Sequence, residues 1–173
     1  MGRLLTPKYV TERTALLATE MALNAVTPHN TVGRMFKGKD CHVVVLVPST
    51  EDVREEDYPL WPNYPVQPYC IHQHSVGDKS EWKAPFDEIA RCKALQLWRG
   101  QNEDGNTDSM PHLLFPDDTP FWGGVKRHGI VVACSGFQPY FDQLVSGIVA
   151  DGIKALARHD FETSGDKGKP FLK

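Results

Sequence analysis

The stretch that decides the fold runs from Phe121 to Asp142 and reads Phe-Trp-Gly-Gly-Val-Lys-Arg-His-Gly-Ile-Val-Val-Ala-Cys-Ser-Gly-Phe-Gln-Pro-Tyr-Phe-Asp. A glycine at position 129 separates Val125 from the apolar run 130–134. Glycine accepts the positive φ angles that a two-residue hairpin turn requires, so His128-Gly129 predicts a tight β-hairpin. The apolar run after the turn predicts a buried strand.

Two dipeptides at the ends of this hairpin form a candidate ligand site. Gly123-Gly124 and Ser135-Gly136 allow close approach of a bound group, because glycine carries no side chain. Their amide hydrogens and the serine hydroxyl can bind a carboxylate, and Lys93 from the neighbouring helix adds positive charge. This hypothesis predicts that Ser135→Ala and Lys93→Ala lose ligand with nearly unchanged thermal stability. The alternative is that the glycines only permit the hairpin and a tight helix entry, with Lys93 a solvated helix residue.

Apolar spacing and proline positions predict the other elements. We expect strands over residues 41–47 and 69–76, and helices over residues 7–27 and 85–99, with a last helix from 139 or 142 to 158. Pro48 is expected to end the first strand, because proline has no N–H for sheet pairing. The core face of the first helix is expected to be carried by residues at helical spacing, namely Val10, Leu17, Met21 and Ala25.

The hairpin and the second helix together resemble the GlcG/HbpS-like family, which includes haem-binding proteins and the C-terminal domain of PduO cobalamin enzymes. The matching residues are Gly123-Gly124, Gly129, Ile130-Val131-Val132, Ser135-Gly136 and Asp142, with Ile89, Ala90, Lys93 and Ala94 in the helix. The resemblance implies one α/β (α+β) domain over residues 1–173. It implies a profilin-like three-layer fold, with about five antiparallel strands and helices on the sheet faces.

The chain departs from the family pattern in two places. Residues 51–68 are first acidic and then rich in proline and aromatic residues, which indicates an inserted surface flap. The strand over residues 41–47 ends in Leu-Val-Pro-Ser, where the family has an acidic turn. Residues 162–173 are mostly polar and are expected to form a frayed, flexible tail.

The resemblance also implies a function, the binding of a small molecule such as haem or a corrinoid. Such a cofactor needs an apolar cleft and often one axial donor, for which the chain offers His72, His74 and His128. The family commonly assembles into dimers or larger rings. The alternatives are therefore a homo-oligomeric assembly module without a cofactor, or a cofactor-assisted enzyme subunit.

Two further patterns bear on chemistry. His72 and His74 share one face of a predicted strand and can chelate a metal ion, with Cys70 as a further ligand. The alternative is a pair of exposed or hydrogen-bonded histidines on an edge strand. A nucleophilic enzyme would need Cys134 or Ser135 beside a base such as His128, across the hairpin turn. The sequence has no nucleophile elbow and no phosphate-binding loop, so it favours a protein without such machinery.

Composition narrows the partners and the compartment. The 173 residues carry a formal net charge of −3 and no basic stripe, which argues against nucleic-acid binding. The longest strongly apolar run, residues 43–47, is too short to span a membrane. The four cysteines form no Cys-x-x-Cys pair and predict buried free thiols in a reducing compartment. A cytoplasmic protein is the expectation.

Overall fold

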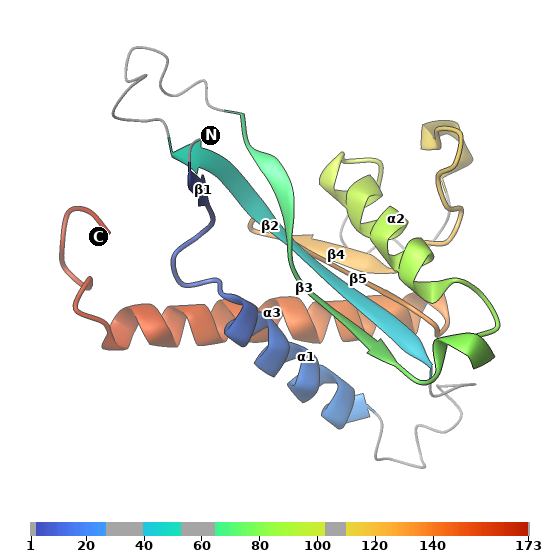
Figure 1. Ribbon diagram of the computed structural model, residues 1–173, viewed down its shortest axis with the longest axis horizontal. Helices are drawn as coiled ribbons and strands as arrows, with labels where there is room; N and C mark the ends of the chain where they lie inside the picture. Colours follow the sequence, from blue (N-terminus) through green and yellow to red (C-terminus); the bar gives the residue numbers. More distant parts are fainter. Residues whose placement is uncertain (1–2, 27–39, 53–64, 103–109, 173) are drawn as a thin grey trace.

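β2, the strand Cys41–Asp52, organises the architecture of the chain (Figure 1). The computed structural model describes residues 3–26, 40–52, 65–102 and 110–172. The other elements are β1 Arg3–Leu5, α1 Glu12–Val26, β3 Gln67–Val76, η3 Lys79–Glu81, α2 Phe86–Trp98, η4 Pro111–Leu113, β4 Gly124–Arg127, β5 Ile130–Ser135 and α3 Pro139–Thr163.

β2 pairs with three strands, all of them antiparallel. β1 pairs with its last residues, β3 with most of its length, and β5 with residues 42–46, while β4 pairs with β5. The expected end of the strand at Pro48 is wrong, because β2 continues to Asp52. The pairing of β2 with β5 ends at Leu46 of β2. Pro48 therefore has no β5 partner, and its missing N–H costs little on that side.

The sheet separates two apolar layers, which confirms the expected mixed α/β class with helices on both faces. Alternate residues of β2 point to opposite faces, so one strand feeds both layers. Cys41, Val43 and Val45 pack with α1 and α3, whereas Val44 and Leu46 pack with α2. Figure 1 shows α1 and α3 side by side on one face and α2 on the other.

The hairpin quoted above has the expected conformation. His128 has a φ of 51° and Gly129 a φ of 84°, so both turn residues are left-handed, as a type I′ turn requires. The Cα partners Arg127 and Ile130 close the turn. Every residue of β5 is buried, which confirms the predicted buried strand.

The first helix differs from its prediction in start and in orientation. α1 begins at Glu12 rather than Pro7, because Thr11 and Thr14 exchange side-chain and backbone hydrogen bonds of 2.9 and 3.2 Å that cap it. Leu17 and Met21 are 37% and 54% exposed, so the expected core face is wrong. The buried face is carried instead by Thr14, Ala15, Ala18, Thr19, Ala22, Leu23 and Val26. The expected end at residue 27 lies outside the described residues.

The expected surface flap and the expected flexible tail are only partly loops. Residues 51–52 belong to β2 and residues 67–68 to β3, while residues 53–64 of the expected flap lie outside the described part of the chain. α3 extends to Thr163, and Asp166 beyond it is buried and bonded to Lys8 and Tyr9. The expectation of a frayed tail is therefore wrong for the residues around Asp166.

The left-handed conformation at Gly129 makes the stability of the protein sensitive to substitution there. Gly129→Ala should lower the free energy of unfolding by about 1–2 kcal/mol, because a side chain at this left-handed φ is strained. His128→Asn is the matched control and should leave stability nearly unchanged, since asparagine tolerates the same conformation. Urea denaturation followed by circular dichroism measures both variants. Equal stabilities for Gly129→Ala and the parent would contradict the assigned turn.

Candidate functional site

A buried ion pair lies where the sequence predicted a ligand site. The Nζ atom of Lys93, on α2, donates to Oδ2 of Asp142 at 2.8 Å and to the carbonyl oxygen of Cys134 at 3.0 Å. Oδ1 of Asp142 accepts the backbone N–H of Phe137 at 3.0 Å. Both charged side chains are only 2% exposed. The expectation that Lys93 is a solvated residue is therefore wrong.

The predicted glycines meet the protein's own atoms. A Cβ at Gly123 would collide with the carbonyl oxygen of Pro139 and lie 2.9 Å from Cβ of Asp142. A Cβ at Gly124 would lie 2.8 Å from the carbonyl oxygen of Val132, and one at Gly136 would collide with the backbone at residue 40. These contacts give the glycines a packing role, as the alternative interpretation of the sequence expected.

The structure thus brings Lys93 and Gly123 together around Asp142, which the sequence analysis did not assign to the site. Ser135 is buried on β5, where it pairs with His42 of β2. The ammonium group of Lys93 already has an internal carboxylate and a carbonyl as partners. A ligand role for Lys93, Gly123, Gly124, Ser135 and Gly136 stays a prediction, and the geometry assigns the cluster a structural role.

The buried ion pair predicts that removal of the Lys93 charge destabilises the fold, whereas the ligand-site hypothesis predicts nearly unchanged stability. Lys93→Met should lower the free energy of unfolding by about 3–5 kcal/mol, because it leaves the Asp142 carboxylate buried without its cation. The double variant Lys93→Met/Asp142→Leu should recover part of this loss. Lys83→Met, at an exposed lysine, is the control and should change little. Nearly unchanged stability of Lys93→Met in urea denaturation would contradict the structural role.

Asp142 also makes stability depend on pH. Burial raises the pKa of Asp142 to about 6 from 3.8, and the nearby Lys93 opposes this rise only in part. A folded-state pKa above the unfolded value stabilises the fold at low pH, and this contribution is lost as pH rises through about 6. The difference in unfolding free energy between the parent and Asp142→Asn should therefore fall between about pH 4 and about pH 7. Denaturation at several pH values measures it, and a difference that rises with pH would contradict the assignment.

The residues of the alternative nucleophilic site are not brought together. His128 lies in the hairpin turn, whereas Cys134 lies near the other end of β5, more than about 10 Å away at about 3.4 Å per residue. A hydrogen bond with Cys41 and burial raise the pKa of the Cys134 thiol well above its ordinary value. All four cysteines are free, as expected, but only Cys41 and Cys134 are buried, while Cys92 is half-buried and Cys70 exposed.

The two histidines of the metal hypothesis do lie together. His72 and His74 pair with Val45 and Val43, so both point to the face of the sheet that α1 covers. Their rings stack with centroids 6.2 Å apart and an interplanar angle of 24°. Within the described ranges, no group of three or more His, Cys, Asp or Glu side chains is placed to hold a metal ion. A complete site needs donors from elsewhere.

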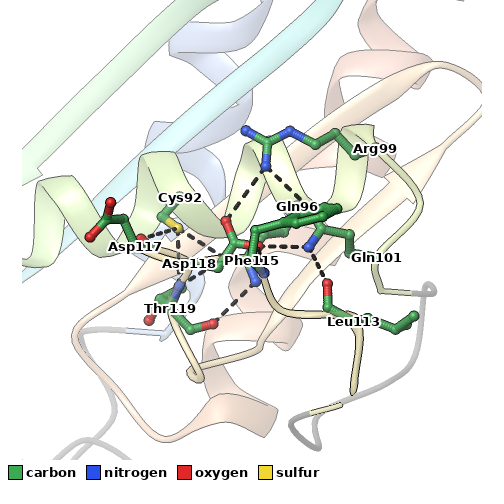
Figure 2. Close-up of polar contacts among 9 residues, drawn as sticks. All are labelled: Cys92, Gln96, Arg99, Gln101, Leu113, Phe115, Asp117, Asp118 and Thr119. Carbon is green, nitrogen blue, oxygen red and sulfur yellow. Dashed lines mark hydrogen bonds and ion pairs between the residues drawn. The ribbon is translucent and has the colours of Figure 1, made fainter. Parts of the chain in front are cut away.

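A polar network joins α2 to the segment that follows it (Figure 2). Gln101 Nε2 donates to Leu113 O at 2.6 Å and to Asp118 Oδ2 at 2.7 Å. The Gln96 amide exchanges hydrogen bonds of 3.1 and 3.2 Å with the backbone of Thr119. Because these groups already have partners, we assign the network to fastening the segment onto α2 rather than to binding a ligand.

An open cleft of about 890 Å³ lies along β1 and the segment that leads into α1. We call it the N-terminal cleft, and its lining comprises Arg3, Leu4, Leu5, Thr6, Pro7, Lys8, Val10, Thr11, Glu12, Pro48, Ser49, Thr50, Val66, Tyr69, Ile71 and Leu172. About half of these residues are apolar, and the charged ones are Arg3, Lys8 and Glu12. The volume falls within the range of about 300–1,000 Å³ typical of small-molecule sites.

The N-terminal cleft also carries polar groups suited to an anion. Arg3 is exposed on β1, and Lys8 is ion-paired with Asp166 at the margin. The Oγ1 atom of Thr50 is buried and has no hydrogen-bond partner among the described residues. This oxygen is buried, whereas Arg3 is an exposed polar group of the lining that a ligand can reach directly. None of the residues that the sequence predicted as cofactor or axial ligands lines this cleft.

Comparisons with protein-family models, with curated proteins and with solved structures found no match to this chain. The GlcG/HbpS-like family therefore stays a prediction from the sequence motifs. Among the helices in the described ranges, none is long and apolar enough to cross a membrane.

Proposed function

We propose that this protein binds a small molecule in the N-terminal cleft. The observation that carries the proposal is an open cleft of about 890 Å³ whose lining combines apolar side chains with the exposed Arg3. Ligand sites in proteins combine an apolar surface with a few directed polar groups in this way.

The lining favours a flat apolar ligand that carries a carboxylate. Leu4, Val10 and Ile71 supply apolar surface, and the Tyr69 ring supplies an aromatic face. Arg3 supplies a cation that can pair with a carboxylate in two parallel hydrogen bonds. A tetrapyrrole such as haem or a corrinoid, the class implied by the family resemblance, has this combination of an apolar ring and acidic groups.

The lining of the N-terminal cleft favours a different axial donor from the three histidines considered in the sequence analysis. His72, His74 and His128 do not line it, whereas Tyr69 does and is 41% exposed. A tyrosine hydroxyl is one of the side-chain groups that coordinate haem iron. We therefore assign Tyr69 as the donor if the ligand is haem. Bound haem would supply redox chemistry, while the chain's own residues bind its edge and orient it.

Titration with hemin, followed by its Soret absorbance, tests this proposal. The parent should give a saturable spectral change at one hemin per chain. Tyr69→Phe should shift the Soret band, because it removes the donor oxygen and keeps the ring. Tyr140→Phe is the matched control, since Tyr140 is also exposed, at 56%, but lies on α3 outside the cleft.

Two further variants separate binding in the cleft from adsorption elsewhere. Arg3→Ala should weaken hemin binding about tenfold, which corresponds to the loss of one charge-assisted contact. Arg13→Ala, at an exposed position on α1 outside the cleft, should bind like the parent. Equal affinities and identical spectra for Arg3→Ala, Tyr69→Phe and the parent would overturn the proposed site.

A further inference from the structure

β3 presents an unpaired edge suited to a second strand. Among the described elements it pairs only with β2, and this pairing is regular from His72 to Val76. The strand Gln67–Val76 contains no Lys, Arg, Asp or Glu. Natural proteins usually protect edge strands with charges, because a row of free N–H and C=O groups invites pairing. The regular part of β3 lacks this protection.

The same part of β3 carries two histidines that could bind a metal ion. His72 and His74 share a face and stack, and Nε2 of His72 is buried with no hydrogen-bond partner among the described residues. Cys70, the third ligand considered from the sequence, is excluded by an irregularity in the register. It pairs with Leu46 on the opposite face, because Ile71 is left unpaired between Cys70 and His72.

Acidic residues surround the histidine pair. Glu12 and Glu20 of α1 act electrostatically on His72 and favour a positive charge there. Both carboxylates belong to α1, the helix that covers the face of the sheet shared by His72 and His74. Neutral imidazoles are the form that binds metal ions, and carboxylates near ligating histidines help to orient them.

We propose that two copies of this chain pair antiparallel along β3, about a twofold axis at Gln73, and bind one Zn²⁺ ion between them. In this register His72 of each copy lies opposite His74 of the other. Residues opposite one another in antiparallel strands point to the same face, with Cβ atoms about 4.5–5.5 Å apart. The four imidazoles therefore gather on one face of the joined sheet.

The number and type of donors select the metal. One chain supplies two imidazoles, whereas zinc prefers four nitrogen or sulfur ligands in a tetrahedral arrangement. The second copy, related by the twofold axis, supplies the other two imidazoles from its own His72 and His74. Rotation of the His72 ring toward the shared ion gives its Nε2 atom a partner that the single chain lacks. The site is thus complete only in the dimer, and the expected stoichiometry is half an ion per chain.

Light scattering of the full chain tests the proposal. The protein is first freed of metal with a chelator and then titrated with ZnCl₂, and bound zinc is measured after dialysis. We expect a zinc-dependent dimer with one ion per two chains, reversed by the chelator. His74→Ala and the more conservative His74→Gln should abolish the dimer. His128→Ala, a histidine in the hairpin turn, should behave like the parent.

A third variant tests the strand pairing separately from the ligands. Gln73→Lys keeps both histidines but places two like charges opposite each other at the twofold axis, so it should weaken the zinc-dependent dimer. Thermal melts of each variant check that it folds. A parent that stays monomeric with zinc, one ion bound per chain, or zinc-dependent association that persists in both His74 variants would overturn the proposal. Hemin binding by the parent does not affect this outcome, because no histidine lines the N-terminal cleft.

Discussion

The ion pair between Lys93 and Asp142 is the constraint on which the arrangement of layers depends. It links α2 and α3, which lie on opposite faces of the sheet, and Lys93 also bonds the carbonyl oxygen of Cys134 at the end of β5. Two buried charges are costly apart and tolerable together, so the pair fixes the position of α2 relative to the start of α3. The neighbouring glycine at 123 is needed because any side chain there would collide with the start of α3.

The length of β2 has a second consequence, at the other end of the sheet. β2 extends beyond its pairing with β5, and its last residues pair with β1. The segment between β1 and α1 then lies across the sheet next to β3, which forms the N-terminal cleft. The open cleft therefore lies at the end of the sheet where β2 extends beyond β5. At the other end, near the ion pair of Lys93 and Asp142, the protein's own side chains fill the space.

Local patterns predicted much of the fold. The helical position of Lys93 also contains information about the buried ion pair. The turn at Gly129, the buried run after it and α2 follow from short-range rules. Lys93 stands at i+3 from Ala90 and i−4 from Leu97, so helical periodicity places it on the buried face of α2. A lysine at such a position indicates a buried acidic partner. Asp142, at the start of α3 before an apolar helix face, was the available candidate.

Local sequence patterns specified the three α-helices, the central strands, the hairpin and the mixed α/β class, because these depend on residue periodicity and on the φ angles that glycine permits. The short strand β1, in contrast, was not predicted. Only the tertiary structure decided the orientation of α1, the extension of β2 through Pro48 and the position of the cleft. These features depend on which surfaces meet: small alanines of α1 pack against α3 while Met21 faces outward. Contacts between residues far apart in the chain decide such choices, and no local pattern encodes them.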